Sequence, residues 1–267
     1  MLLARVITAL VMVSVFGLAL FIADQYQWLI FMLVGTLWAT WEWGGFAKLQ
    51  AGVNLLYSFG VTVFAYLLYV YFQDTPLFFL APFVVLVMLT SVTLFQIQQG
   101  KALLTSTVLI LVLGGLMTTA FFISMVAFRK LFSPELLLLC LSVIWALDIG
   151  AYFSGKRFGK HKLAVYVSPG KTWEGVFGGT VFAFVTAYVG LSLLQFYTLT
   201  PAWQTALILS LIGLFSVYGD LFESLLKRQA NIKDSGHLLP GHGGLLDRID
   251  SLLFAMPVFY IFWLWVS

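Results

Sequence analysis

Long runs of apolar residues alternate along the chain with short polar breaks. A helix needs about 20 mainly apolar residues to cross the roughly 30 Å hydrocarbon core of a bilayer. The strands of a membrane barrel are instead alternating segments of about 10 residues. The pattern therefore predicts transmembrane helices. Nine are expected, at residues 6–23, 28–43, 53–72, 77–97, 103–128, 134–154, 175–196, 203–221 and 249–266.

The composition supports this fold class. Hydrophobic residues make up 61% of the chain and charged residues 9%, whereas soluble domains carry about 25% charged residues. We expect an all-α, polytopic helical bundle that forms a single integral membrane domain over residues 1–267. Within it, N-terminal helices (about 1–133) precede catalytic helices and cytoplasmic loops (about 134–267). The single cysteine, Cys140, excludes an intramolecular disulfide framework and any site with several cysteine ligands.

The placement of basic residues predicts the orientation. If nine spans alternate, one set of connections carries twelve of the fourteen Lys and Arg residues, and the other carries only Arg129 and Lys130. The positive-inside rule then places the N-terminus in the cytoplasm and the C-terminus outside. The second and fifth spans are the weakest of the nine: the second is short and ends at the polar Glu42, and the fifth contains two glycines (114–115) and two threonines (118–119). The first span is longer than a typical signal-peptide core and lacks a clear cleavage site, so we expect it to be retained.

A basic loop, residues 154–175, is the first of two long polar stretches. Alone, it is about as well explained by contact with anionic headgroups as by catalysis. Gly170, Lys171 and Thr172 look like the end of a phosphate-binding P-loop. That motif also needs a glycine where Val165 stands, and we expect no strand before it, so a Walker A site is excluded. Lys171 and nearby backbone amides remain candidates to bind a phosphate.

The second polar stretch, residues 218–250, is bracketed by two acidic pairs. Asp220 and Glu223 are three positions apart, as are Asp247 and Asp250, so each pair shares one face of a continuing helix. Carboxylates near phosphate-binding cations are typical of a magnesium–phosphate site. The basic residues between the pairs are Lys227, Arg228, Lys233 and Arg248. The alternative for Asp247 and Asp250 is stabilisation of a helix N-terminus.

A glycine-rich turn, residues 240–244, leads into the last span. Gly243 and Gly244 allow positive φ angles and close approach of the main chain to a ligand. His242 is as well explained by holding the turn as by contacting phosphate. A zinc site on His237 and His242 is disfavoured because no Cys or third nearby His completes it.

Asp148 lies inside a predicted span. An ionisable residue there is costly and indicates a functional site by default. The alternative is an interfacial aspartate that pairs with Lys156 or Arg157.

These residues carry a specific resemblance. The 27-residue pattern Ser-Leu-Leu-Lys-Arg (224–228), Lys-Asp (233–234), Pro-Gly-His-Gly-Gly (240–244) and Asp-Arg-Ile-Asp (247–250) resembles the signature of phosphatidate cytidylyltransferases, also called CDP-diacylglycerol synthases, without departure. Residues 148–152 and 168–175 also resemble that family. The resemblance covers roughly the C-terminal half, and the first five spans match only in hydrophobic character.

The resemblance implies transfer of cytidylyl from CTP to phosphatidic acid, which gives CDP-diacylglycerol and pyrophosphate in phospholipid biosynthesis. It implies magnesium, with or without a second cation, and a bacterial cytoplasmic (inner) membrane enzyme whose active site faces the cytoplasm. Its partners would be CTP, phosphatidic acid and the bilayer, without nucleic acid. A homodimer is compatible with such a bundle.

The roles that follow from the resemblance fall into three groups. The catalytic residues would be Asp220, Asp247, Asp250, Lys227 and Arg248. The metal ligands would be Asp220 and Asp247, with Glu223 and Asp250 as weaker candidates. The substrate-binding residues would be Asp148, Ser168, Lys171, Thr172, Arg228, Lys233, His242, Gly243 and Gly244.

Rival functions fit less well. An ion-coupled transporter or cation channel would place binding groups near the midplane and often shows internal repeats, whereas the charges here gather at one face. A CDP-alcohol phosphotransferase would need an Asp-Gly pair, which the sequence lacks. A purely structural scaffold would not need so many phosphate-compatible groups beside glycine.

Overall fold

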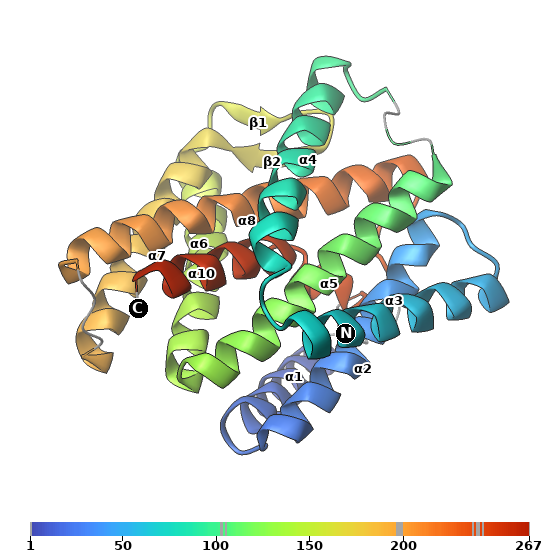
Figure 1. Cartoon of the computed structure of the whole chain (residues 1–267). Helices are drawn as coiled ribbons and strands as arrows, with labels where there is room; N and C mark the ends of the chain where they lie inside the picture. The colour runs from blue at the N-terminus through green and yellow to red at the C-terminus, as the bar shows by residue number, and fades with distance from the viewer. Residues whose placement is uncertain are drawn as a thin grey trace.

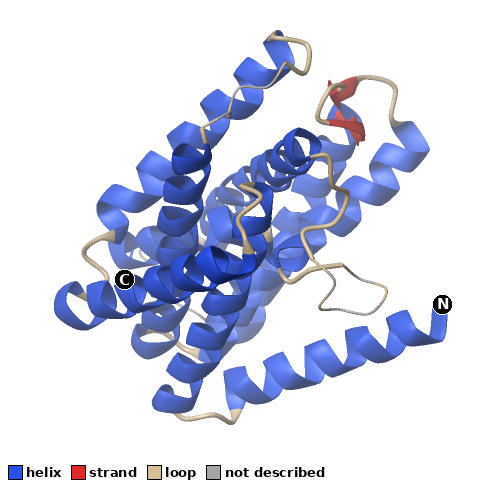
Figure 2. Ribbon diagram, turned by 90° about the vertical axis from the view of Figure 1, so that its right-hand side faces the viewer, coloured by secondary structure: helices blue, strands red, loops and turns tan. Residues whose placement is uncertain are grey.

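The computed structural model describes residues 2–101, 104, 106–195, 200–236, 238, 241 and 243–266 as a helical bundle with one small β-hairpin (Figures 1 and 2). The helices are α1 (Leu2–Phe21), α2 (Gln25–Phe46), α3 (Ala51–Phe72), α4 (Leu77–Ile97), α5 (Thr107–Leu131), α6 (Pro134–Phe158), α7 (Trp173–Leu194), α8 (Ala202–Ala230), α9 (Leu246–Ile249) and α10 (Leu252–Val266). The strands are β1 (Lys162–Ala164) and β2 (Ser168–Thr172). The chain is thus a polytopic helical membrane protein, as the apolar runs predicted.

Seven segments of the described part of the chain are long and apolar enough to cross a membrane. They are α3, α4, α5, α6, α7, α8 and the stretch Leu246–Val266. In α1, the apolar part is the shorter Val6–Phe21, and α2 is not among the seven. These seven segments correspond to the third to ninth predicted spans. The first two predicted spans stay a prediction.

Helix boundaries differ from the predicted spans where polar side chains take part. α2 begins earlier because Asp24 and Gln27 form a capping box, in which each side chain accepts a hydrogen bond from the backbone N–H of the other. α8 runs past Leu221 to Ala230, so the first acidic pair and Lys227 lie on one continuous helix. The last predicted span is divided into α9 and α10 around Asp250.

The basic loop contains structure that the sequence did not predict. β1 and β2 pair antiparallel, with Lys162 opposite Thr172, so the expectation of no strand before Gly170 was wrong. Thr172 ends β2 and caps α7, because its side chain accepts a hydrogen bond from the N–H of Gly175 at 3.1 Å. The hairpin also reaches α4, where the N–H of Tyr166 donates to Oε1 of Gln96 at 3.3 Å. Lys171 is therefore held on a short strand rather than on a loose loop.

The buried side chains form one hydrophobic core that includes residues from α1 through α10. α8 crosses the molecule and packs against α4, α6, α7 and α10 (Figure 1). α6 and α7 pack closely side by side, through glycines that leave room for the facing backbone. α1 runs along one edge of the bundle (Figure 2), and Leu20 is its one buried residue among those whose side chains are described. Large apolar side chains of α1, α3, α4 and α7 point outward, as expected for a lipid-facing surface.

Candidate active site

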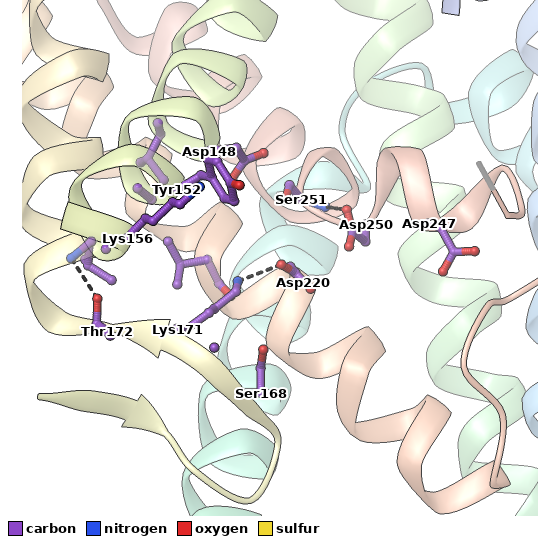
Figure 3. A pocket seen from close by; sticks show the side chains of 17 residues that line it. Asp148, Tyr152, Lys156, Ser168, Lys171, Thr172, Asp220, Asp247, Asp250 and Ser251 are labelled. Carbon is purple, nitrogen blue, oxygen red and sulfur yellow. Dashed lines mark hydrogen bonds and ion pairs between the residues drawn. The ribbon is translucent and has the colours of Figure 1, made fainter. Parts of the chain in front are cut away.

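A cavity of about 580 Å³ opens between α6, the hairpin and the C-terminal part of α8 (Figure 3). Seven of the predicted site residues line it: Asp148, Ser168, Lys171, Thr172, Asp220, Asp247 and Asp250. They come from α6, β2, α8, α9 and the junction between α9 and α10. The fold thus brings the basic loop together with Asp220, Asp247 and Asp250 of the two acidic pairs, although the loop and the pairs lie far apart in the sequence.

Lys171 and Asp220 form an ion pair across the cavity, with 2.7 Å between Nζ and Oδ2 (Figure 3). The Lys171 ammonium also donates to the backbone oxygen of Val217 at 3.4 Å. One turn later on α8, the hydroxyl of Ser224 donates to Oδ1 of Asp220 at 3.2 Å. About a third of the Asp220 side chain is exposed, so this carboxylate remains accessible from the cavity.

Asp247 is held by four donors. Its Oδ1 lies 2.7 Å from Nζ of Lys227. Its Oδ2 accepts hydrogen bonds from the N–H of Ser235 at 2.9 Å, from the Ser235 hydroxyl at 3.0 Å and from the N–H of Gly244 at 2.8 Å. Asp247 therefore organises the loop that precedes α9, which agrees with the alternative that it stabilises the start of this helix.

Glu223 contacts the same lysine from outside the cavity lining. Its side chain is 3% exposed, and its Oε1 is 3.2 Å from the same Lys227 ammonium. Neither carboxylate oxygen accepts a hydrogen bond from the residues that the structure describes, and Glu223 is not among those that line the cavity. Lys227 therefore contacts both Glu223 and Asp247 and offsets the charge of both.

Asp148 faces the same cavity from α6 (Figure 3). Its carboxylate is attracted by the charge of Lys171, is repelled by that of Asp220 and lies beside the side chain of Ser251. Within the described part of the chain it makes no ion pair with Lys156 or Arg157. The ammonium of Lys156 lies instead 5.8 Å from the centre of the Tyr152 ring. The interpretation of Asp148 as part of the site is thus better supported than pairing at the membrane interface.

The remaining predicted residues lie away from the cavity lining. Arg228, Lys233 and Arg248 are exposed on the surface. Gly243 and Gly244 do not line the cavity but pack against carboxylates: a Cβ on Gly243, whose φ is +86°, would lie 2.5 Å from Oδ2 of Asp247. The predictions for His242 and for the disfavoured His237–His242 zinc site fall outside the described residues.

The sequence interpretation missed several residues of the site. Tyr152 and Lys156 line the cavity together with Asp148, and Ser251 does so beside Asp250. The helical period could have found the first two, because positions 148, 152 and 156 share one face of α6. Ser235 and Glu42 were also missed. Glu42 of α2 contacts the loop before α9, although 203 positions separate it from Leu245.

The donor set suits a hard divalent cation. Four carboxylates line one cavity, and Mg²⁺ is commonly held by one or two carboxylates together with substrate phosphates. Among the described residues, no group of three or more His, Cys, Asp or Glu side chains is arranged to hold a metal. Two carboxylates and a phosphate would not require such a group, so the residues fit magnesium that binds with a phosphorylated substrate.

Comparison with known proteins points in the same direction. The model of the cytidylyltransferase family matches residues 3–266. A phosphatidate cytidylyltransferase of Haemophilus influenzae is 48% identical over 133 residues, which cover 49% of this chain and 46% of that protein. Its namesake from Pseudomonas aeruginosa is 50% identical over 129 residues (46% and 45%), and that of Bacillus subtilis is 50% identical over 118 residues (44% and 43%). The chain spans less than half the length of these relatives in the matched segments.

Proposed function

The chain belongs to the cytidylyltransferase family, and on that premise we propose that it transfers a cytidylyl group from CTP to phosphatidic acid. The products are CDP-diacylglycerol and pyrophosphate, in a step of phospholipid biosynthesis. The observation that carries this proposal is the cavity itself. It joins Lys171 of the basic hairpin to acidic side chains of α6, α8 and the α9–α10 junction, beside a membrane bundle that a lipid substrate can approach.

The reaction needs charge neutralisation more than proton transfer. An oxygen of the lipid phosphate attacks the α-phosphorus of CTP, the bond from that phosphorus to the bridging oxygen breaks, and the electron pair leaves with pyrophosphate. The nucleophile is already anionic, so no strong general base is required. The rate then depends on positioning and on preorganised cationic groups.

Different residues of the cavity are proposed to bind the phosphates and the metal. Lys171 and Ser168 of β2 bind CTP phosphates, and Thr172 holds β2 against the start of α7. Asp220, Asp247 and Asp250 are the proposed ligands of Mg²⁺, which when bound supplies charge neutralisation between the attacked and the leaving groups. Lys227 fixes the orientation of Asp247 through the 2.7 Å contact.

We also propose that the site faces the cytoplasm of a bacterial inner membrane. Two sets of contacts support the alternation of spans. At one end, α2 contacts the loop before α9, and α4 contacts the hairpin. At the other end, Arg129 donates to the backbone oxygens of Leu20, in the last turn of α1, and Ala23, in the connection to α2. Tyr260 donates to Asp74 at 2.9 Å. The first end collects the basic connections and is therefore the cytoplasmic end.

Turnover of labelled CTP tests the proposal. Purified protein with labelled CTP, phosphatidic acid and Mg²⁺ is expected to form CDP-diacylglycerol, and EDTA should stop the reaction until Mg²⁺ is restored. Ion flux in liposomes without any CDP-diacylglycerol would overturn the enzymatic proposal. Turnover that persists in EDTA would overturn only the role of the metal.

A further inference from the structure

Glu42 is a buried carboxylate that neither the acidic pairs nor the cavity lining includes. It lies near the end of α2, is 4% exposed, and has both oxygens engaged. Oε1 accepts hydrogen bonds from the N–H of Leu245 at 2.9 Å and from the indole N–H of Trp38 at 3.1 Å. Oε2 accepts from the N–H of Leu246 at 2.8 Å and from the Ser235 hydroxyl at 3.0 Å. Every one of these partners is neutral.

Three of the four donors are Ser235, Leu245 and Leu246. We call the described residues of this segment (235, 236, 238, 241 and 243–246) the anchor loop. This loop lies between α8, which ends at Ala230, and Asp247, and its last residue, Leu246, is the first of α9. A buried polar group is costly unless it is hydrogen-bonded, and a charged acceptor strengthens each bond that it receives. Glu42 and the loop amides therefore satisfy one another's hydrogen-bonding groups.

The anchor loop is shaped to receive this carboxylate. A Cβ on Gly236 would lie 2.6 Å from Oε1 of Glu42, and a Cβ on Gly244 would lie 2.4 Å from Oε2. Any larger residue at these positions would collide with a carboxylate that four hydrogen bonds hold in place. These two glycines are thus explained by the approach of the loop to Glu42 and not by the cavity, whose lining does not include them.

Ser235 connects Glu42 to the catalytic side. Its hydroxyl lies 3.0 Å from Oε2 of Glu42 and 3.0 Å from Oδ2 of Asp247, so its single proton lies between two carboxylates. Asp247 in turn contacts Lys227, which contacts Glu223. A continuous chain of contacts runs from α2 through the loop to the cavity.

We propose that Glu42 is a positioning residue for cytidylyl transfer: from α2 it fixes the anchor loop and so holds Asp247 and Lys227 at the edge of the cavity. The inference rests on the proposed function and gives the N-terminal helices a part in it. Glu42 itself does not touch the cavity. Its effect is on turnover more than on CTP binding, because Lys171 and Ser168 lie on the hairpin.

The test uses Glu42→Gln, which keeps size but places an amide N–H₂ opposite donors. Glu42→Asp keeps both oxygens on a shorter side chain. The matched control is Asp74→Asn, which changes a structural carboxylate of the N-terminal half that accepts a hydrogen bond from Tyr260 far from the loop. The readouts, in the purified full-length protein, are amide hydrogen exchange of the peptide that contains Leu245 and Leu246, and kcat and KM for CTP.

In Glu42→Gln we expect exchange of the loop amides to rise by about tenfold or more, as follows from the loss of charge-assisted hydrogen bonds. We expect kcat to fall by about tenfold or more, while KM for CTP changes by less than about threefold, since an interaction that supports only the transition state lowers kcat. Glu42→Asp should recover part of both effects, and Asp74→Asn should show neither.

A second variant guards against simple misfolding. Gly236→Ala leaves Glu42 in place but blocks the approach of the loop, so it should reproduce the change in exchange. In the double variant with Glu42→Gln the effects should not add, because both disturb one contact. The inference is overturned if the loop amides of Glu42→Gln stay as protected as in the wild type, or if exchange rises without a fall in kcat. Absence of CDP-diacylglycerol formation by the wild type would instead overturn the proposed function, while the exchange data still test the anchor.

Discussion

At the scale of single residues, the acidic side chains differ by the cation and the donors beside them. Asp220 pairs with Lys171 and stays about one-third exposed. Asp247 shares Lys227 with Glu223, and both carboxylates are nearly buried. The sequence presents two acidic pairs with identical spacing, but their partners differ. Asp220 and Asp247 both line the cavity, Asp247 also holds the loop before α9, and Glu223 is a buried neighbour of Lys227.

Lys171→Ala is expected to weaken the use of CTP. A hydrogen bond to a charged group contributes about 1.5–3 kcal/mol, which corresponds to a fall in kcat/KM of roughly 10- to 150-fold, since about 1.4 kcal/mol is tenfold. Steady-state kinetics with varied CTP measures it. The matched control is Lys162→Ala, an exposed lysine of β1 on the same hairpin. Unchanged kcat and KM in Lys171→Ala would show that Lys171 does not bind CTP and that the hairpin is only a basic surface loop.

Asp247→Asn is expected to lower kcat by about 100-fold or more. It removes the negative charge beside Lys227, and it weakens the hydrogen bonds from the three donors to Oδ2. Turnover and the melting temperature are both measured, so that loss of activity is separated from loss of fold. Glu135→Gln is the control, at an exposed carboxylate in the first turn of α6. Turnover near that of the wild type would remove Asp247 from the site.

At the scale of elements, the site depends on how closely α6 and α7 approach. Gly179 faces α6, and a Cβ at this position would lie 2.5 Å from the backbone oxygen of Leu147. Small residues allow such contacts between membrane helices. Because Asp148 follows Leu147 on α6 and β2 leads directly into α7, this contact also sets the distance between Asp148 and the hairpin.

Gly179→Ala is therefore expected to destabilise the protein by about 1–3 kcal/mol, the usual cost of overpacking, and to lower its melting temperature in detergent. The control is Gly60→Ala on α3, where an added Cβ meets no atom within 4 Å. The substitution at Gly60 should leave the melting temperature unchanged or raise it, because alanine favours a helix more than glycine does. Equal melting temperatures for the two variants would show that α6 and α7 can separate without cost.

At the scale of the whole molecule, the bundle has two chemically different ends. One end holds the hairpin, the anchor loop and the cavity, and the other holds Arg129 and the contact between Tyr260 and Asp74. The hydrophobic core between them is continuous. Under the proposed function, the lipid substrate would reach the cavity from the bilayer, and CTP would reach it from the water on one side only.

Cysteine labelling in whole cells tests this orientation. The single native cysteine, Cys140, is fully buried and gives little background. With a membrane-impermeant maleimide, Glu135→Cys should be labelled in intact cells, whereas Lys162→Cys should react only after permeabilisation. The reverse pattern would place the cavity outside the cytoplasm.

The sequence by itself determined the features that follow from solvent and spacing. Long apolar runs require membrane helices, because backbone groups in lipid must pair within the segment. The spacing of the second polar stretch identified the family resemblance and placed Asp220, Asp247 and Lys227 near one another. Asp148 was found because an ionisable residue in a span is costly.

Only the tertiary structure decided which of these groups share the cavity. The strand that carries Lys171 is too short to show a pattern, and it forms because β1 lies opposite β2. Arg228, Lys233 and Arg248 belong to the polar stretch but lie on the surface. Glu42 reaches the anchor loop across about 200 positions of sequence, and a single chain carries no local signal for a contact at that separation. Local spacing thus identified the candidate residues, and packing between distant segments decided which of them line the cavity.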